Sequence, residues 1–304
     1  MNPDKTQTLL LVDDTASNID ILVDLLSDSY DLLVALDGPS CLEILQHEAV
    51  DLVLLDIMMP VMDGYTVCRE IQNKPDLCDI PVIFLTAKSD EVSIEQAYAS
   101  GGIDYVTKPF KRMELLARIK THLRLRSLMR EMEYLAQHDS LTGLFNRRHF
   151  FQLASTLFDS NPQVLAAMID IDDFKQINDA HGHAVGDTVI RRIATILERN
   201  LDPGQVAGRI GGEEFAVVAT HTNRDRFWEM IERIRNEVST HALSETNNTL
   251  TFRISCGVAE KTPDMSSIDA LLVNADMALY QAKFAGKNRS VRARARDIPQ
   301  PGPR

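Results

Sequence analysis

Two adjacent carboxylates lie at a glycine-rich turn in the second half of the chain. Within residues 209–218, an apolar run is followed by Gly211, Gly212, Glu213 and Glu214, and then by a second apolar run. This pattern predicts a β-hairpin whose glycines can take positive φ angles and let a ligand approach the backbone. Neighbouring carboxylates repel each other unless a cation or a donor-rich ligand offsets the repulsion. A solvated acidic turn is the alternative, and this stretch alone does not separate the two interpretations.

Other residues in the same half could complete a metal and phosphate site. The apolar run 164–169 predicts a strand that ends at Asp170, whose carboxylate could bind a divalent metal ion together with Glu213. Lys283 and Lys287 are four residues apart around the predicted end of a helix, so they could share one face and hold a polyphosphate. The alternative for the lysines is that they complement the helix dipole.

Asn178 and Asp187 form a polar pair that could bind the edge of a base. A carboxylate accepts hydrogen bonds from N1–H and the exocyclic amino group of guanine, whereas adenine has no donor at N1. Either residue could instead cap a helix. Taken together, a metal, a polyphosphate and a guanine site indicate an enzyme that uses GTP.

In the first half, four short apolar runs each end in a polar group. The runs 9–12, 52–55, 82–85 and 105–107 are followed by Asp13 and Asp14, by Asp56, by Thr86 and by Lys108, in that order. Ligands of parallel sheets bind outside the carboxyl ends of the strands, so these groups should meet in one crevice. Clustered carboxylates suit Mg²⁺, Asp56 could form an acyl phosphate, and Thr86 and Lys108 could bind the phosphoryl oxygens. The alternative is that the strand-end aspartates only cap helices.

The elements that must position these groups follow from the apolar patterns. Short strands alternate with amphipathic helices in the first half, which predicts an α/β domain with a doubly wound parallel sheet. Helices with apolar faces are expected after Gly186, through Phe227 to Ile234, and over 268–284, and a strand is expected over 250–255.

Between the halves, the sequence predicts a long helix that reaches Gln137. No Pro or Gly occurs between Phe110 and Gln137, and good helix formers are abundant there. The apolar residues form two rows with a phase slip between them: Leu116, Ile119 and Leu123, and then Leu125, Leu128, Met132 and Leu135. The first row should pack on its own domain. The second fits a coiled-coil seam, so we expect a parallel dimer of linker helices.

Composition limits the class of protein. The 304 residues include 44% hydrophobic and 25% charged residues and carry a net charge of −12, which suits a soluble protein of about two domains and argues against nucleic acid as a partner. Four scattered cysteines, without metal-ligand spacing, are expected to be free thiols in a reducing compartment. No signal peptide or membrane span is predicted, so a cytoplasmic location is expected.

The first half resembles a response-regulator receiver domain with a flavodoxin-like fold. The matching motifs are Asp13-Asp14, Asp56 with Met58-Met59-Pro60-x-x-Asp63-Gly64, Leu85-Thr86-Ala87 and Lys108-Pro109-Phe110. The resemblance implies phosphorylation of Asp56 by a histidine kinase. It also implies Mg²⁺ bound by Asp13 or Asp14, Asp56 and the Met58 carbonyl. Thr86, Lys108 and Tyr105 would form the switch that reports phosphorylation.

The second half resembles a GGDEF-family diguanylate cyclase domain, a cyclase-like α/β fold with a mostly antiparallel central sheet. The matching motifs are Asp139-x-Leu141-Thr142-Gly143-Leu144-x-Asn146-Arg147-Arg148, Asp170-x-Asp172-x-Phe174-Lys175-x-x-Asn178-Asp179, Gly182-His183-x-x-Gly186-Asp187, Gly211-Gly212-Glu213-Glu214-Phe215 and Ala282-Lys283-x-x-Gly286-Lys287-Asn288. The implied reaction joins two GTP into cyclic di-GMP and two pyrophosphates, with one GTP bound by each subunit of a homodimer of facing domains.

That resemblance assigns roles to individual residues. Mg²⁺, with Mn²⁺ as an alternative, would be bound by Asp170, the Ile171 carbonyl and Glu213. The substrate residues would be Phe174 and Lys175, through backbone amides, with Lys283 and Lys287 at the phosphates and Asn178 and Asp187 at guanine. Glu213, Glu214 and Lys175 are expected to be catalytic, and whether Glu213 also takes the proton of the attacking hydroxyl stays open.

Two positions depart from the family pattern. Many members carry Arg-x-x-Asp five residues before the glycines as a product-inhibition site, and here the segment reads Asp202-Pro203-Gly204-Gln205. We therefore expect this form of feedback to be absent. Lys287 stands where the family often has Arg, which is a mild change for phosphate binding.

These patterns define four segments: a receiver domain at 1–122, a helical coiled-coil linker at 123–137, a GGDEF domain at 138–291 and a disordered tail at 292–304. The leading hypothesis is a diguanylate cyclase controlled by phosphorylation, dimeric through its receivers, linker helices and facing GGDEF domains. The alternative is a non-catalytic effector that binds GTP or cyclic di-GMP and acts through protein contacts.

Overall fold

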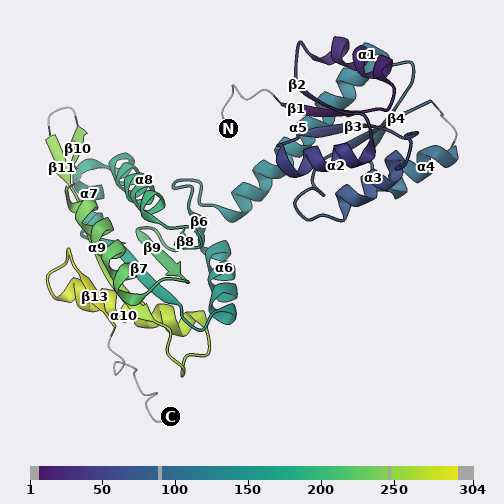
Figure 1. The fold of residues 1–304 in the computed structure, drawn as a ribbon. Coiled ribbons are helices and arrows are strands. Elements are labelled where there is room, and N and C mark those ends of the chain that lie inside the picture. The colour runs from purple at the N-terminus through teal and green to yellow at the C-terminus, as the bar shows by residue number, and fades with distance from the viewer. Residues whose placement is uncertain (1–6, 88–90, 241, 246–247, 294–304) are drawn as a thin grey trace. The chain divides into compact units, whose positions relative to one another are not determined.

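The computed structural model describes residues 7–87, 91–240, 242–245 and 248–293 of the chain. The backbone divides into two compact units, Met1–Glu131 and Met132–Arg304 (Figure 1). None of the helices in these described ranges combines the length and the apolar character that a membrane span needs.

The first unit contains a five-stranded sheet in the order β2-β1-β3-β4-β5, and every neighbouring pair is parallel. Its strands are β1 (Thr8–Val12), β2 (Asp31–Ala35), β3 (Leu52–Asp56), β4 (Val82–Thr86) and β5 (Asp104–Thr107). Its helices are α1 (Ala16–Leu26), α2 (Gly38–His47), α3 (Gly64–Gln72), α4 (Glu91–Ala99) and α5 (Arg112–Gln137). Every residue of β3 and β4 is buried, as parallel strands covered on both faces require. The predicted doubly wound parallel sheet is confirmed.

The long helix α5 is one continuous element of 26 residues. Leu115, Ile119 and Leu123 are buried in the core of the first unit, and Leu116 packs partly against it. Arg126 is also buried, and its guanidinium donates hydrogen bonds to the carbonyls of Val50 (3.0 Å) and Asp51, which compensate for the loss of water. The second apolar row is exposed in this single chain: Leu125, Leu128, Met132 and Leu135.

The second unit contains a six-stranded sheet in the order β13-β12-β7-β9-β8-β6. Its strands are β6 (Phe145–Asn146), β7 (Leu165–Ile171), β8 (Val206–Arg209), β9 (Glu214–Ala219), β12 (Ile254–Glu260) and β13 (Ser290–Arg292). The three central pairings are antiparallel and the two edge pairings are parallel, so the predicted mostly antiparallel sheet is confirmed. A separate two-stranded hairpin is formed by β10 (Ala242–Glu245) and β11 (Asn248–Thr251).

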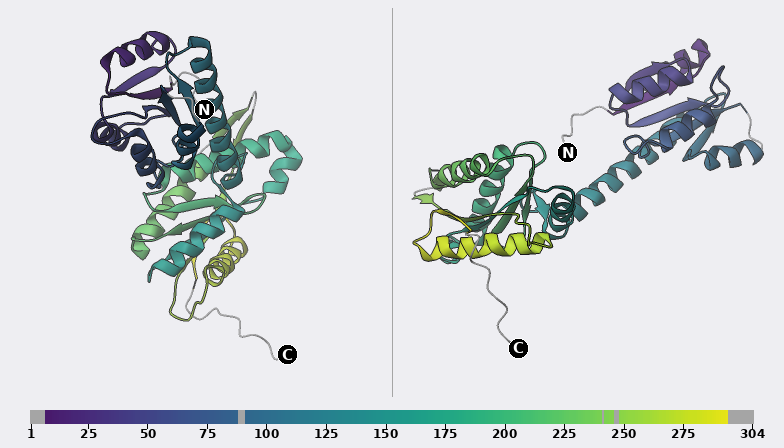
Figure 2. Two further views of the ribbon diagram at one scale, coloured as in Figure 1. Left: turned by 90° about the vertical axis from the view of Figure 1, so that its right-hand side faces the viewer. Right: turned by 60° about the horizontal axis from the view of Figure 1, so that its bottom comes forward.

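Helices cover both faces of this sheet (Figures 1 and 2). They are α6 (Arg147–Ser160), α7 (Phe174–His181), α8 (His183–Asn200), α9 (Arg224–Thr240) and α10 (Ile268–Phe284). Alternate residues of β7 point to opposite faces, which creates two cores. One core lies under α7, α8 and α9, and the other lies under α6 and α10.

Two sequence predictions were wrong in this unit. The expected strand over 250–255 is interrupted, because β11 pairs with β10 and ends at Thr251, whereas β12 pairs with β7 and begins at Ile254. The expected disordered tail begins too early, since Arg292 belongs to β13 and its guanidinium lies 4.5 Å from the centre of the Trp228 ring. Residues 294–304 of that tail lie outside the described residues.

Candidate functional site

The first unit brings a lysine and buried aspartates together at the carboxyl edge of its sheet. Lys108 Nζ lies 2.7 Å from Asp13 Oδ2 and 2.9 Å from Asp56 Oδ1. Asp13, Asp14 and Asp56 offer carboxylate oxygens that all lie within 4.8 Å of one another, and among the described residues no other group of three acidic, His or Cys side chains does so. Burial raises the pKa of Asp56, Lys108 opposes this, and Asp13 adds to it. An added divalent cation would relieve that repulsion, so these residues fit Mg²⁺.

Two further predicted switch residues belong to neighbouring strands of the same sheet. Thr86 is buried at the end of β4, and Tyr105 is half-buried in the neighbouring strand β5. The Tyr105 ring packs edge-on against Tyr98 at 6.4 Å between centroids. Met58, whose carbonyl was predicted to bind the metal ion, is 70% exposed. A Cβ on Gly64 would lie 2.2 Å from the Asp56 carbonyl oxygen, so this loop can pack here only with glycine.

The second unit holds a smaller acidic cluster at one end of β7. Asp170 is 4% exposed, and its Oδ1 lies 2.8 Å from Lys283 Nζ. In the antiparallel pair of β7 and β9, Asp170 stands opposite Glu214, and Glu213 directly precedes it at the hairpin tip. Ile171, the other predicted metal ligand, is the last residue of β7.

The electrostatics of this cluster favour a cation. Burial raises the pKa of Asp170, Lys283 lowers it, and Glu214 and Asp172 raise it further. Burial likewise raises the pKa of Glu213, with Asp170 adding to the shift and Lys283 opposing it. Both carboxylates have a raised pKa and offer oxygen ligands, so a bound Mg²⁺ would stabilise their charged forms. Asp170, Glu213 and the Ile171 carbonyl therefore fit the predicted ion.

The hairpin tip corrects the expected role of its glycines. Neither Gly211 nor Gly212 has a positive φ angle, although five other glycines of the described residues do. A Cβ on Gly211 would lie 2.2 Å from Glu214 Oε2, so the absent side chain makes room for that carboxylate. A Cβ on Gly212 would meet nothing within 4 Å, which leaves the backbone there open to a ligand.

Two residues that the sequence reasoning left without a role hold this tip in place. Arg209 donates to the Gly212 carbonyl through Nε (3.2 Å) and a terminal nitrogen (2.7 Å), and its other terminal nitrogen contacts both oxygens of Asp139. Arg147 donates to the Ile210 carbonyl (2.9 Å). Asp139 and Arg147 belong to the motif at 139–148, and Arg209 lies shortly before the glycines of the hairpin. No spacing in the sequence indicates that this motif contacts the hairpin.

The phosphate lysines lie differently from the prediction. Because α10 ends at Phe284, Lys287 is beyond the helix, in the left-handed conformation (φ 61°), and does not share a helical face with Lys283. Lys283 instead contacts Asp170 in β7, and Lys287 Nζ lies 2.5 Å from Oδ1 of Asp173, the residue before α7. The expected phosphate amides begin α7, where Phe174 is buried and the Lys175 side chain is exposed.

The predicted guanine residues come from two contacting helices, α7 and α8. The Asn178 side chain lies against α8 so closely that a Cβ on Gly186 would be 2.0 Å from Asn178 Oδ1. Asp187 is the next residue of α8 and is half-buried. Asn178 Oδ1 is buried and accepts no hydrogen bond from the described residues, which leaves an acceptor for the donors of guanine.

Comparisons with known proteins agree with both halves. The family model "Diguanylate cyclase, GGDEF domain" matches residues 136–289, and the model "Response regulator receiver domain" matches residues 9–120. The response regulator PleD of Caulobacter vibrioides is 32% identical over 252 residues, which are 79% of this chain and 56% of PleD. The probable diguanylate cyclase DgcC of Escherichia coli is 38% identical over 175 residues, which are 56% of this chain and 47% of DgcC. The chain thus spans about half the length of the curated relatives it matches.

Solved structures are similar to the second unit. The coiled coil and GGDEF domain of DgcB from Caulobacter crescentus, in complex with c-di-GMP, superposes with a TM-score of 0.54 at 31% identity. The match covers 60% of this chain and 98% of that one. With a receiver model over the first half and a GGDEF model over half of the whole chain, this protein belongs to the GGDEF family, as a response regulator whose receiver domain is fused to a GGDEF domain.

Proposed function

We propose that this protein condenses two molecules of GTP into cyclic di-GMP and two pyrophosphates, under the control of receiver phosphorylation. The observation that carries the proposal is the contact between Lys283 and the buried Asp170, next to Glu213 at the same edge of the sheet. A cation-binding pair of carboxylates beside a lysine is the arrangement that nucleotidyl transfer needs.

In the proposed reaction, the ribose 3′-oxygen of one GTP attacks the α-phosphorus of the other. The new bond joins the 3′-oxygen to phosphorus, the α–β phosphoanhydride bond breaks, pyrophosphate leaves, and the hydroxyl proton passes to water. A second attack of the same kind, by the 3′-oxygen of the other nucleotide on the remaining α-phosphorus, closes the ring and releases the second pyrophosphate and proton. A divalent ion bound by Asp170, Glu213 and the Ile171 carbonyl would supply charge neutralisation at the phosphates. Lys283 and Lys287 would hold the phosphate oxygens, as charge-assisted donors.

Glu214 and Arg209 would keep the tip in the shape that the reaction needs. Glu214 occupies the space that Gly211 leaves, and Arg209 fixes the Gly212 carbonyl. We assign the Lys175 side chain to charge stabilisation at the phosphates, since it is exposed in the first turn of α7. At the other end of the nucleotide, Asn178 and Asp187 would select guanine through its N1–H and amino donors.

The proposed regulation begins at Asp56. A histidine kinase would phosphorylate Asp56, with Mg²⁺ bound by Asp13, Asp14, Asp56 and the Met58 carbonyl. Lys108 and Thr86 would then bind the phosphoryl group, and Tyr105 would report its presence. Because one domain holds one GTP, ring closure needs a second chain, so the active state would be a homodimer through receivers, linker helices and facing GGDEF domains. The proposed location is the cytoplasm.

The test uses the purified protein with GTP and Mg²⁺, with and without beryllofluoride as an acyl phosphate mimic. Chromatography should show cyclic di-GMP and pyrophosphate, with more product when beryllofluoride is present. A protein that forms no cyclic dinucleotide under either condition contradicts the enzymatic proposal. An unchanged beryllofluoride response in Asp56→Asn contradicts only the proposed switch.

A further inference from the structure

Two turns with left-handed backbone meet at the proposed phosphate site. Asp173 has a φ of 57°, and Lys287 and Asn288 have φ of 61° and 47°. Residues other than glycine seldom adopt this conformation, and they keep it when surrounding contacts hold it in place. Since Lys287 Nζ contacts Asp173 Oδ1 at 2.5 Å, the two turns also share an ion pair.

Asp172 joins these turns through its buried carboxylate. Asp172 Oδ2 accepts a hydrogen bond from the Asn288 backbone N–H (2.9 Å), and Oδ1 accepts one from the Ser255 hydroxyl (2.7 Å). Ser255 is fully buried and Asp172 is 7% exposed. A charge-assisted hydrogen bond from the Asn288 N–H to this carboxylate therefore fixes the residue that follows Lys287.

Arg235 holds the same turn from α9. One terminal nitrogen of Arg235 donates to the Asn288 carbonyl (3.2 Å) and to Asn288 Oδ1 (3.1 Å). Glu232 accepts from Arg235 Nε (3.1 Å) and from the other terminal nitrogen (3.0 Å), and Asn236 accepts a further bond at 2.7 Å. The Arg235 guanidinium is thus held by its own helix through Glu232 and Asn236, and it holds the turn through Asn288.

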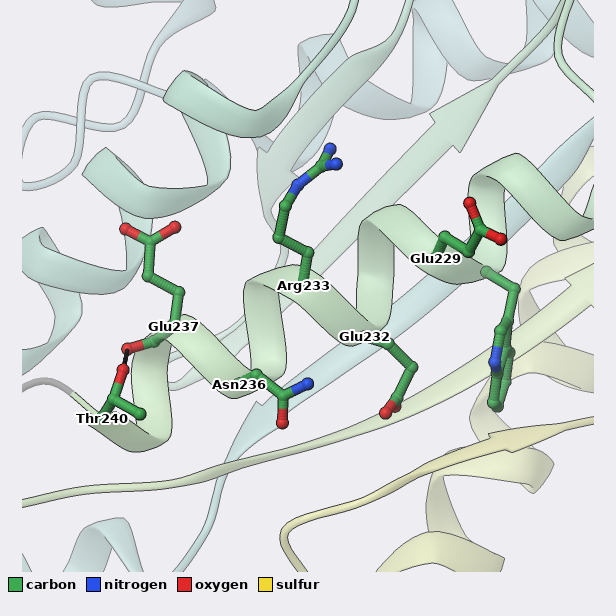
Figure 3. Close-up of a pocket in the computed structure, with 7 residues that line it drawn as sticks. Glu229, Glu232, Arg233, Asn236, Glu237 and Thr240 are labelled. Carbon is green, nitrogen blue, oxygen red and sulfur yellow. Dashed lines mark hydrogen bonds between the residues drawn. The ribbon is translucent and has the colours of Figure 1, made fainter.

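The side of α9 that carries this contact differs from its other side. Glu232 and Asn236 point to one side of the helix, and Arg233 and Glu237 point to the other (Figure 3). The Arg235 side chain is only 14% exposed, whereas Arg199, which pairs with Glu237, is 65% exposed. An exposed Arg–Glu pair contributes little to stability, so Arg199 and Glu237 provide a matched reference for the Arg235 contact.

We infer that Arg235 and Asp172 are positioning residues, which set the 287–288 turn and thereby aim Lys287 at the β- and γ-phosphates of the bound nucleotide. The inference rests on the proposed function, in which Lys287 binds phosphate oxygens, and adds that these oxygens belong to the β- and γ-phosphates. In this inference both residues act through Asn288, with which each forms hydrogen bonds, and not by contact with the nucleotide.

The test compares Arg235→Gln, Asp172→Asn and the control Arg199→Gln in the full chain. Affinities are measured for a non-hydrolysable GTP analogue and for GMP, together with the melting temperature and the KM and kcat of the wild type and each variant. Arg235→Gln and Asp172→Asn should weaken binding of the GTP analogue about tenfold, the size of one lost charge-assisted contact. GMP lacks the β- and γ-phosphates, so its affinity should not change, and Arg199→Gln should behave as the wild type.

A double-mutant cycle separates positioning from general damage. If Arg235 acts through Lys287, adding Arg235→Gln to Lys287→Ala should weaken GTP-analogue binding no further. Equal losses for GMP and the GTP analogue, additive losses in the cycle, or wild-type affinity in both variants would each overturn the inference. If Arg235→Gln melts far below the wild type, the near-isosteric Asp172→Asn decides the question. A wild type that forms no cyclic dinucleotide speaks against the proposed function, whereas the binding comparison still tests the positioning of Lys287.

Discussion

At the scale of single residues, both lysines proposed for phosphate binding already have acidic partners. Lys283 contacts Asp170, and Lys287 contacts Asp173. In the proposed complex, the phosphates would become the partners of the lysines and a metal ion would become the partner of Asp170. Binding then exchanges one set of ion pairs for another, so that neither the lysines nor Asp170 has to be buried without a counter-charge.

Asp170 should be indispensable for activity. Asp170→Asn keeps the shape of the side chain but removes the charge that would bind the cation, so kcat should fall by at least about 100-fold. The measurement is the initial rate of cyclic di-GMP formation at saturating GTP and Mg²⁺. Asp276→Asn, an exposed change in the middle of α10, is the control and should retain the wild-type rate. Retention of more than about a tenth of the rate by Asp170→Asn would contradict this role.

Asp139 should stabilise the GGDEF domain in a pH-dependent manner. Burial raises its pKa, but hydrogen bonds from Thr142 and Arg209 outweigh this and bring the pKa below its ordinary value of 3.8. A lowered carboxyl pKa adds stability above the pKa of the unfolded chain, and this stability is lost as the pH falls through the folded pKa. Asp139→Asn should therefore lower the free energy of unfolding at pH 7 by about 1–2 kcal/mol.

The difference between Asp139→Asn and the wild type should shrink as the pH drops below about 4, where the unfolded carboxyl takes up its proton. Urea unfolding followed by circular dichroism between pH 3 and pH 7 measures it. A difference that stays constant over this range would show that Asp139 acts by packing rather than by its charge.

Sequence reasoning found these residues better than it found their partners. Residue type alone indicated that Asp170, Glu213 and Lys283 suit metal and phosphate chemistry, and the fold brings them to one edge. The contact between Arg209 and Asp139 joins residues 70 positions apart, and no local periodicity encodes it. The turn at Lys287 was missed for a related reason: three consecutive residues with positive φ, from Gly286 to Asn288, follow α10, so Lys287 does not continue the helical face of Lys283 as the lysine spacing suggested.

At the scale of elements, the site depends on how closely α10 packs on β12. A Cβ on Gly257 of β12 would lie 2.0 Å from the Ala275 carbonyl oxygen and 2.1 Å from the Leu279 nitrogen of α10. This close approach brings α10 onto the sheet, with Lys283 in its last turn. The apolar pattern predicted α10 with its observed bounds, but the depth of this contact depends on a glycine that no periodicity singles out.

Gly257→Ala should therefore damage both stability and the site. Two backbone atoms of α10 would have to move, so we expect a loss of at least about 3 kcal/mol in the free energy of unfolding. Gly212→Ala is the matched control, because a Cβ there meets nothing, and its stability should stay within about 0.5 kcal/mol of the wild type. Thermal unfolding of both variants measures the contrast. Similar melting temperatures for the two would mean that α10 is free to shift.

At the scale of the whole molecule, the two units share one helix, since the boundary between Glu131 and Met132 falls within α5. The part of α5 up to Arg126 is bound to the first unit through Leu115, Ile119 and Arg126. The two apolar rows were predictable from spacing. Sequence did not predict the end of the bound segment, because it depends on Arg126, a charged residue that is buried on backbone carbonyls.

The exposed row on α5 leads to the last prediction. Leu125, Leu128, Met132 and Leu135 present apolar side chains to solvent in the single chain. In the proposed reaction, two GGDEF domains that each hold one GTP must meet. If this row is the seam between two chains, the double substitution Leu128→Glu and Met132→Glu should shift the protein towards monomer and lower its specific activity at least about tenfold. Sedimentation velocity and initial rates at several protein concentrations measure both effects.

The control is Arg130→Gln with Glu133→Gln, two exposed changes on the same helix at positions that do not flank the seam, which should leave the oligomeric state unchanged. The activity of the double Glu variant should recover as its concentration rises, because mass action restores the pairing of two GGDEF domains whose own sites are intact. A variant that is monomeric and yet fully active at every concentration would remove the linker seam from the proposed mechanism. A dimer that is inactive would instead place the role of this row in the rotation of the two GGDEF domains relative to each other.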